Sequence, residues 1–374
     1  MKPVVIAGYA RSPFCFASKG ELAKVRADDL AASVVRALLE RTKVNPEDIE
    51  DLMLGCAFPE GEQGLNVAKL IGFLAKLPLS VAGVTMNRFC GSSMQAIHSA
   101  AGAIQLGAGE VFICAGVESM TRVPMSGFNP MPNPDLAAAY PAAYMGMGQT
   151  AENVAAKYKI SRKEQETFAV LSHAKAAAAQ SAGKLKDEIV PYGPVTQDGC
   201  IRPGTVLEKL AELKPAFDAK GSVTAATSSP LTDGASATLV ASEDYARAHG
   251  LPILARIKSV AVAGCLPEIM GIGPVAATQK ALKRAGLTIK DIDIIELNEA
   301  FASQSLAYIA DLGIDITKVN LDGGAIALGH PLGATGARIT GKAASLLKRE
   351  GKKYALATQC IGGGQGIATI LEAV

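Results

Sequence analysis

The chain has 374 residues, more than one hydrophobic core usually holds, which favours several domains or a duplicated fold. Hydrophobic residues make up 49% and charged residues 19% of the sequence, which is typical of a well-packed α/β protein and excludes a disordered one. The formal net charge of +2 gives no indication of nucleic-acid or membrane-surface binding.

The cysteine pattern argues against a disulfide framework and against a zinc site, because the number is odd and no CxxC pair occurs. The N-terminus enters a strand directly and lacks the pattern of a signal peptide, and no apolar run is long enough to span a bilayer. We therefore expect a cytoplasmic protein without a metal site. The seven cysteines are Cys15, Cys56, Cys90, Cys114, Cys200, Cys265 and Cys360.

The first 120 residues alternate between predicted strands and helices. Apolar residues at helical spacing mark the helices, and short runs rich in β-branched residues mark the strands. This alternation indicates an α/β layer fold with a buried sheet. The predicted elements are strand Val4–Gly8, helix Asp28–Arg41, strand Asp51–Gly55, strand Val81–Asn87, helix Cys90–Leu106 and strand Glu110–Gly116.

Residues 121–249 differ in character and are predicted to form an inserted loop domain. The segment opens with a run of prolines, which is typical of loops. Two helices are predicted, Thr150–Tyr158 and Ser161–Ser181, and Ser161 with Glu164 fits a capping box. The basic residues that follow are compatible with ordinary surface positions or with binding an anionic ligand.

The C-terminal part repeats the landmarks of the N-terminal part at one constant offset. Asp48 and Asp291 are 243 residues apart, and so are the helix starts near Cys90 and Gly333 and the strands from Glu110 and Lys353. Repeats of this kind determine the architecture. The sequence therefore predicts two similar α/β halves, 1–120 and 250–374, packed on each other.

Cys90 is the first candidate for chemistry, because it lies between a predicted strand and a predicted helix. A helix N-terminus offers free N–H groups and a positive dipole end, which lower the pKa of a thiol. The small residues Gly91, Ser92 and Ser93 leave little bulk to bury the sulfur. The alternative is a buried structural cysteine.

Three further candidates lie near predicted strand ends or helix starts in the C-terminal half. His330 lies in a glycine-rich stretch, Gly323–Arg338, with a helix expected from about Ala334. This stretch alone does not separate a structural histidine from a titratable site residue. Asn298 follows strand Asp293–Leu297 and could hold a water or carbonyl, or cap the next helix. Cys360 follows strand Tyr354–Thr358 and precedes three glycines whose N–H groups could bind an oxyanion.

At these residues the sequence resembles the thiolase family over essentially the whole chain. Four motifs match in family order, which makes the resemblance specific. The resemblance implies a five-layered αβαβα fold of two duplicated halves with an inserted loop domain. The motifs are Asn87–Gln95 (NRFCGSSMQ), Asn298–Phe301 (NEAF), Gly323–Gly333 (GGAIALGHPLG) and Cys360–Gly366 (CIGGGQG).

The resemblance also implies the roles of individual residues. Cys90 would be the acylated nucleophile, His330 would take its proton, and Cys360 would move the proton at the α-carbon. Asn298 would position a water that forms one oxyanion hole with His330, and the N–H groups of Cys90 and Gly362 would form the other. Coenzyme A and substrate contacts are assigned to Arg202, Ser229, Met147 and Phe301.

The implied reaction is reversible thiolysis of 3-ketoacyl-CoA to acetyl-CoA and a shortened acyl-CoA, with coenzyme A thioesters as substrates and no metal or redox cofactor. Ser93-Met94-Gln95 resembles degradative members, and Gly146 replaces a histidine often found in biosynthetic ones. We therefore expect a broad chain-length range. Pro230 stands where many members have Gly, so the loop containing Ser229 is expected to be stiffer.

Three alternatives remain at this stage. A biosynthetic acetyl-CoA C-acetyltransferase would make acetoacetyl-CoA. A non-catalytic CoA- or lipid-binding relative would be expected to lack Cys90, His330 or Cys360. A decarboxylating condensing enzyme usually pairs its cysteine with two histidines. The resemblance further implies a homodimer or homotetramer and leaves open whether a hydratase–dehydrogenase subunit binds.

Overall fold

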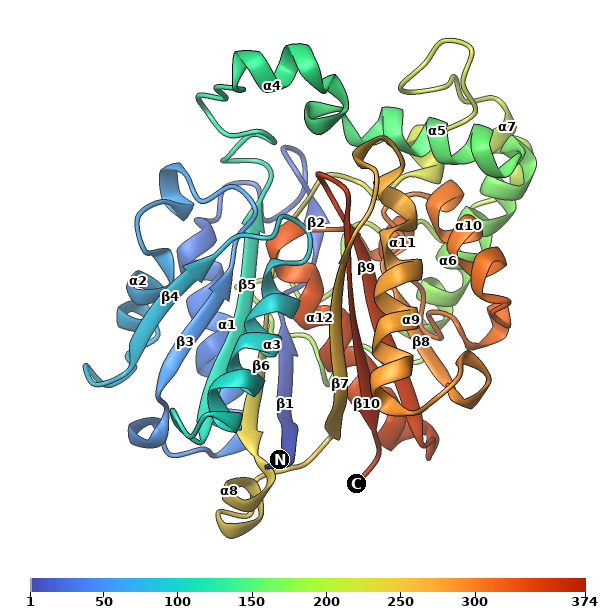
Figure 1. Cartoon of the computed structure of the whole chain (residues 1–374). Coiled ribbons are helices and arrows are strands. Elements are labelled where there is room, and N and C mark those ends of the chain that lie inside the picture. Colours follow the sequence, from blue (N-terminus) through green and yellow to red (C-terminus); the bar gives the residue numbers. More distant parts are fainter. Residues whose placement is uncertain (1) are drawn as a thin grey trace.

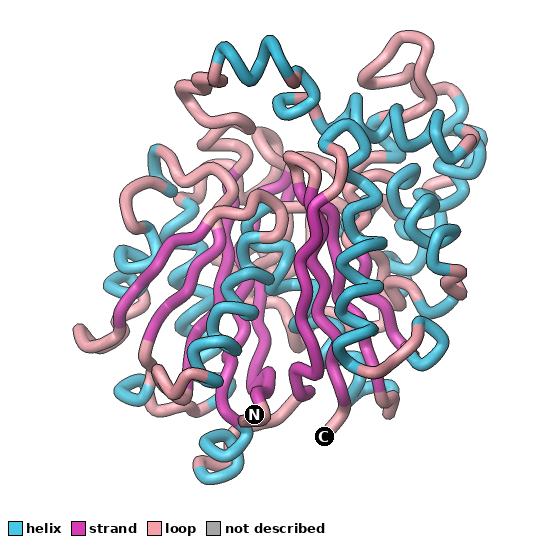
Figure 2. Tube along the Cα trace, in the orientation of Figure 1, coloured by secondary structure: helices cyan, strands magenta, loops and turns pink. Residues whose placement is uncertain are grey.

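The computed structural model describes residues 2–374 and contains ten strands and twelve α-helices within that range. Figure 1 shows the arrangement, and Figure 2 separates helices, strands and loops by colour. The strands are β1 Val4–Arg11, β2 Cys15–Phe16, β3 Asp51–Gly55, β4 Ala82–Met86, β5 Val111–Ser119, β6 Thr232–Ser242, β7 Ala255–Gly264, β8 Ile294–Leu297, β9 Tyr354–Ile361 and β10 Gln365–Glu372.

The helices alternate with the strands in both halves and cluster together in the segment between them. They are α1 Ala27–Thr42, α2 Val67–Leu74, α3 Ser92–Gln105, α4 Pro134–Ala139, α5 Met147–Tyr158, α6 Arg162–Ser181, α7 Leu207–Ala211, α8 Glu243–Ala248, α9 Gly273–Ala285, α10 Ala302–Leu312, α11 Ala325–Leu328 and α12 Leu332–Glu350. Within residues 2–374 none of these helices combines the length and apolarity that a bilayer crossing requires.

Two half-sheets share one hydrogen-bonded path. The strand order is β4-β3-β5-β6-β1-β7-β10-β9-β8, with β2 paired to β6 outside the path. In the N-terminal half-sheet β3, β4 and β5 are parallel and β6 is antiparallel. The two half-sheets pair with each other only where Val5 lies opposite Arg256 and Ile6 opposite Ala255. The connection is therefore a narrow strip near one end of β1 and β7.

Helices cover both half-sheets in five layers. Alternate residues of β1 point to opposite faces, so Val5 packs with α1 and α2 while Ile6 packs with α3 and α12. The second cluster also contains residues of β9 and β10, which places α3 and α12 between the half-sheets. Helices α9 and α10 cover the far face of the C-terminal half-sheet. This is the predicted αβαβα order.

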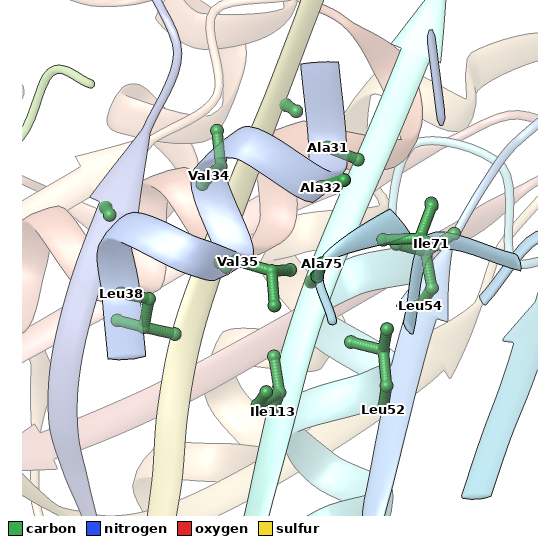
Figure 3. Close-up of a cluster of buried hydrophobic side chains, with 14 of the residues drawn as sticks. Ala31, Ala32, Val34, Val35, Leu38, Leu52, Leu54, Ile71, Ala75 and Ile113 are labelled. Atoms are coloured by element: carbon green, nitrogen blue, oxygen red, sulfur yellow. The ribbon is translucent and has the colours of Figure 1, made fainter. Parts of the chain in front are cut away.

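The outer N-terminal layer shows why these residues form these elements. In Figure 3, Val35 of α1 points toward Ile113 of β5, and Leu52 of β3 belongs to the same buried cluster. Helical spacing on α1 and alternation on the strands bring these side chains to one interface. Each fully buried aliphatic side chain contributes about 1.5–3 kcal/mol relative to exposure.

The two halves have matching elements, which confirms the predicted duplication. Short 3₁₀ turns, Pro46–Asp48 and Ile289–Asp291, precede β3 and β8 at the same offset. Strands β5 and β9 start 243 residues apart, at Val111 and Tyr354. The counterpart of β4 is reduced to a single parallel bridge between Ile295 and Val319.

The chain leaves the sheets after β5 and returns at β6. The intervening segment, 120–231, holds α4 to α7, and Figure 1 places α4, α5 and α7 above the upper ends of the strands. The predicted span 121–249 includes β6, which lies between β5 and β1 as a fully buried sheet strand. The segment outside the sheets is thus shorter than that span, and the three-domain division stays a prediction.

Several local predictions need adjustment. The glycine-rich stretch contains one helical turn, α11, with Gly324 before it and Gly329 after it at a φ of 102°. Helix α12 begins at Leu332 rather than near Ala334, and β9 continues through Cys360 to Ile361. The predicted capping box of α6, Ser161 with Glu164, is confirmed.

Candidate active site

Cys90 lies in the tight turn between β4 and α3. Phe89 has a left-handed φ of 42°, and Gly91 N–H donates to the carbonyl of Arg88 at 2.9 Å. The side chain of Asn87 accepts a hydrogen bond from Phe89 N–H at 2.7 Å. A positive φ in a non-glycine residue is uncommon and is concentrated at functional sites.

The Cys90 side chain is buried against apolar residues that include Ala57, Met120 and Leu332. Burial raises the pKa of the thiol to about 12, although a hydrogen bond from Gly362 N–H lowers it in part. The expectation of a lowered thiol pKa is therefore wrong for the resting protein, because lost solvation outweighs the helix terminus. Cys90 rests as a thiol and needs a base to become a nucleophile.

His330 follows α11 and immediately precedes the Pro331 N-cap of α12. Its backbone N–H donates to Thr232 Oγ1 at 3.1 Å, and its Nδ1 lies 2.6 Å from Thr335 Oγ1. Burial, with a smaller effect of the Arg338 cation, lowers the pKa of the imidazole to about 3. His330 is therefore neutral at physiological pH and has one unprotonated ring nitrogen that can take a proton.

Asn298 extends from the end of β8 toward this histidine. Its Nδ2 lies 3.3 Å from His330 Nε2, and both side chains are buried. Helix α10 begins at Ala302 with Phe301 at the N-cap, so the alternative in which Asn298 caps this helix is wrong. The buried Oδ1 of Asn298 has no hydrogen-bond partner among the described residues, which suits an acceptor for a bound water.

Cys360 lies near the end of β9 and is buried next to Cys90. Burial raises the pKa of the Cys360 thiol well above its usual value, and the neighbouring Cys90 adds to this rise. Its apolar surroundings include the sequence-predicted residues Met147 and Phe301. A Cβ added to Gly362 would lie 3.4 Å from Met147 Sδ, so Met147 is a close neighbour of Gly362.

The structure thus brings residues from distant parts of the chain into two adjoining groups. One contains Cys90, Cys360 and the N–H of Gly362, and the other contains Asn298 and His330. Leu332 packs in the Cys90 cluster two residues after His330. The arrangement supplies a thiol nucleophile, a neutral imidazole, a second thiol and an N–H donor in a region largely withdrawn from water.

Two residues of this region were not found from the sequence. The side-chain amide of Gln359 donates to the backbone carbonyl of Cys90, which ties β9 to the Cys90 turn. The carboxylate of Glu118 accepts from the N–H groups of Ala57, Phe58 and Gly333. A polar residue inside an apolar strand was the only signal in the sequence for either one.

Arg202 and the sequence neighbours of Ser229 line one small pocket. The residues that line this pocket with Arg202 include Ser228 and Pro230, which directly precede and follow Ser229 in the sequence. The Arg202 guanidinium stacks 5.2 Å from the ring centre of Phe16. Ser229 N–H donates to the carbonyl of Ala300 at 2.9 Å, which links this loop to the Asn298–Phe301 segment.

Two family models together match almost the whole chain. Residues 4–244 match the family model "Thiolase, N-terminal domain", and residues 251–373 match "Thiolase, C-terminal domain". The chain belongs to the thiolase family. As a thiolase it is an acyltransferase, and the αβαβα fold predicted from its sequence is confirmed.

Three related thiolases illustrate the similarity. A 3-ketoacyl-CoA thiolase of Bacillus subtilis (strain 168) is 48% identical over 389 residues, covering 100% of both chains. The structure of human mitochondrial 3-ketoacyl-CoA thiolase in complex with CoA has a TM-score of 0.92 at 40% identity, covering 100% of this chain and 98% of that one. The acetyl-CoA acetyltransferase of Bacillus anthracis has a TM-score of 0.91 at 38% identity, with coverage of 100% and 99%.

Proposed function

We propose that this thiolase cleaves 3-ketoacyl-CoA with coenzyme A to acetyl-CoA and an acyl-CoA shortened by two carbons, and runs the reverse condensation. The observation that carries the proposal is the meeting of Cys90, Cys360 and Gly362 N–H, together with the contact of Asn298 with His330, two residues before Leu332 of the Cys90 cluster. The 3-ketoacyl-CoA thiolases among the relatives, at 48% identity over full length and in a CoA complex, support this substrate class.

In the first half-reaction, Cys90 gives its proton to His330 and its sulfur bonds to the 3-keto carbon. The tetrahedral intermediate collapses with cleavage of the bond between C2 and C3, which leaves an acyl-Cys90 and an enolate. Cys360 gives its proton to the α-carbon of this enolate, so acetyl-CoA leaves. A general acid within reach contributes typically 10²–10⁴-fold to such a step.

In the second half-reaction, the thiol of coenzyme A loses its proton to the Cys360 thiolate and attacks the acyl-Cys90. Cys90 leaves and regains its proton from His330, which restores both thiols. The covalent intermediate divides the reaction into two transfers and predicts ping-pong kinetics. The residues thus return to their starting protonation states without a metal or redox cofactor.

The reaction forms two negative oxygens, one on the acyl carbon and one on the enolate, and both need hydrogen-bond donors at fixed positions. The N–H of Gly362, which faces the Cys90 sulfur, together with Cys90 N–H would bind the oxyanion of the acyl carbon. His330 and a water held by Asn298 Oδ1 would bind the enolate oxygen. Loss of one such donor typically costs about 2.7–4 kcal/mol in transition-state binding.

Coenzyme A would enter through the pocket that contains Arg202. The exposed guanidinium of Arg202 suits the phosphates at the nucleotide end, and Ser229 on the adjoining loop suits the pantetheine. Met147 and Phe301, which surround Cys360, would contact the substrate nearest the reacting atoms. We infer that coenzyme A is a substrate here and not a bound cofactor.

The acyl chain is proposed to extend past Gly146. A Cβ placed on Gly146 would meet no other atom within 4 Å, so the glycine leaves open space just before Met147. A larger residue would narrow this space. A substrate range broader than acetoacetyl-CoA follows, although the similarity to an acetyl-CoA acetyltransferase keeps the biosynthetic reaction as a second candidate.

A substrate series tests the proposal. The purified protein should cleave a six-carbon and a ten-carbon 3-ketoacyl-CoA as well as acetoacetyl-CoA, because the open space at Gly146 admits the longer chains. The Cys90→Ala variant should lose thiolysis entirely. Cleavage confined to acetoacetyl-CoA would support the acetyltransferase, and acyl-CoA binding with no turnover would support a non-catalytic relative.

We also propose a homodimer that uses the free edge of β4. No residue of this edge strand is buried, its Val84 is exposed, and the exposed apolar residues Leu65, Phe73 and Leu79 belong to the neighbouring segments. An exposed apolar edge is a template for pairing with a second strand. Light scattering should give twice the mass of 38.5 kDa, or four times it if a tetramer forms, and Val84→Lys should release monomers.

Cytoplasmic activity is part of the proposal. All seven cysteines are free within residues 2–374, and six of them are buried. Free buried thiols are typical of proteins in reducing compartments. Cell fractionation with a tagged protein tests this placement.

A further inference from the structure

A line of four buried groups passes through the imidazole of His330. Asn298 Nδ2 lies 3.3 Å from Nε2, Thr335 Oγ1 lies 2.6 Å from Nδ1, and the same Oγ1 lies 3.0 Å from the carbonyl oxygen of Pro331. Asn298, His330 and Thr335 are each at most 4% exposed. Because bulk water does not reach these positions, the hydrogen of each contact must come from one of the two groups in that contact.

Counting the hydrogens gives one arrangement for this line. An amide nitrogen only donates, so Nε2 of His330 accepts from Asn298. A neutral imidazole has one ring hydrogen, which must then be on Nδ1 and point to Thr335 Oγ1. The hydroxyl of Thr335 is left to donate to Pro331. Each of the three contacts in the line then has one donor and one acceptor.

We propose that Thr335 is a positioning residue that holds His330 in the Nδ1–H tautomer and thereby keeps Nε2 as the proton acceptor. The proposal rests on the proposed function, in which His330 takes the proton of Cys90. Thr335 touches neither substrate nor reacting atoms and acts only through His330.

The chemistry at Thr335 suits a neutral base. A carboxylate in its place would stabilise the imidazolium and favour a resting ion pair. A hydroxyl orients the ring without adding charge, so the resting pair is a thiol and a neutral imidazole. Once Nε2 has taken the thiol proton it becomes a donor, and the same nitrogen can then hold the thioester oxygen while Nδ1–H stays on Thr335.

The position of Thr335 in the fold explains its fixed geometry. It lies in the first turn of α12, and its backbone N–H and hydroxyl both contact the carbonyl of Pro331, four residues back. His330 directly precedes Pro331, so the helix start sets the spacing between the hydroxyl and the ring. The ring orientation is thereby tied to a helix and not to a mobile loop.

Nitrogen NMR of protein labelled with ¹⁵N-histidine tests the proposal directly. The His330 signals, identified by their loss in His330→Ala, should show a protonated Nδ1 and an unprotonated Nε2 in the wild type. Thr335→Ser should keep this pattern because it keeps the hydroxyl. Thr335→Val, of similar shape, should shift the population toward Nε2–H by a factor of up to about ten, the range for one lost hydrogen bond.

Kinetics of the same variants give the second readout. Thr335→Val should lower kcat for thiolysis and the rate of Cys90 alkylation by about threefold to tenfold, with KM for coenzyme A unchanged. Thr335→Ser should stay within about twofold of wild type. Thermal melts of both variants check that each is folded.

The outcomes separate the two proposals. A wild-type His330 with its proton on Nε2 overturns the role of Thr335, and so does a Thr335→Val protein with wild-type tautomer and rates. Full thiolysis by Cys90→Ala instead overturns the proposed function, whatever the tautomer. The NMR pattern does not depend on turnover, so it is measurable in either case.

Discussion

The carboxylate of Glu118, at the end of β5 in the N-terminal half, accepts a hydrogen bond from the N–H of Gly333 in the C-terminal half at 2.8 Å. The same carboxylate holds Ala57 and Phe58, which flank the Cys90 turn. One buried side chain thus connects the start of α12, next to His330, to the surroundings of Cys90.

Glu118→Gln should destabilise the protein by about 3 kcal/mol, because the amide nitrogen would face buried N–H donors and leave at least one of them unpaired. Urea unfolding measures this loss, and the rate of thiolysis should fall with it. Glu47→Gln, at an exposed carboxylate, is the matched control and should change stability by less than about 0.5 kcal/mol. Equal stability of the two variants would contradict the bridging role.

The raised pKa of Cys90 predicts a specific pH profile for alkylation without substrate. Because burial places this pKa at about 12, the thiolate fraction should rise roughly tenfold per pH unit from about pH 7 to 10. The rate of iodoacetamide labelling should therefore climb without a plateau in this range. The Cys90→Ser protein gives the background rate, and a plateau near neutral pH would show a stabilised thiolate instead.

The partly buried His98 should make stability fall in mild acid. Burial lowers the pKa of His98 to about 3, so between about pH 6.5 and 3 the unfolded chain binds a proton that the folded chain does not. The contribution of this group to the free energy of unfolding is complete above the unfolded pKa. It falls by up to about 1.4 kcal/mol for each unit by which the pH is lowered.

Urea unfolding between pH 4.5 and 7 checks this slope in the wild type and in His98→Gln. The glutamine can keep a hydrogen bond to Thr369, which lies 2.8 Å from His98 Nε2, but it does not titrate. The variant should show a smaller pH dependence of stability than the wild type. Identical slopes would mean that His98 is not held neutral in the folded state.

Gly336 allows the close approach of α12 to α3. A Cβ at this position would lie 2.3 Å from the backbone nitrogen of Met94, so Gly336→Ala should force the helices apart and destabilise the protein by about 1–3 kcal/mol. Gly102→Ala is the control on α3, since nothing lies within 4 Å of its Cβ position, and it should stabilise by about 0.5–1 kcal/mol. Thermal or urea unfolding of the two variants should give opposite signs.

Arg202→Ala should raise the KM for coenzyme A about tenfold, the loss expected for one charge-assisted hydrogen bond, with kcat within about twofold. Lys220→Ala, another exposed cation of the same segment, should leave both constants unchanged. Steady-state kinetics with varied coenzyme A measures the difference. Equal KM values for the two variants would show that Arg202 does not bind the nucleotide end of coenzyme A.

The sequence predicted the layered fold and the duplication because apolar periodicity and repeated landmarks are local signals. It did not place β6 in the N-terminal sheet, because Thr232–Ser242 consists mostly of small residues and follows a long irregular segment. Strand pairing of β6 with β5 and β1 depends on contacts with distant parts of the chain, which periodicity does not report.

Motifs identified the candidate site residues, but not what surrounds them. The partners Glu118, Thr335 and Gln359 act through hydrogen bonds whose geometry depends on how elements meet in the fold. The direction of the shift in the pKa of Cys90 was predicted wrongly for the same reason. A helix start is visible in the sequence, whereas the apolar side chains that bury the sulfur come from other elements.

The constant offset between the halves gives each candidate catalytic position a mirror position in the other half. Cys90 corresponds to Gly333 (333 − 90 = 243), Asn298 to Gly55 (298 − 55 = 243) and Cys360 to Val117 (360 − 117 = 243). A Cβ on Gly333 would stand within 2.8 Å of backbone atoms of both Gly55 and Val117, so these mirror positions touch and close up. The two halves have equivalent folds, but the chain has one reactive centre, because backbone atoms fill the space at the mirror positions.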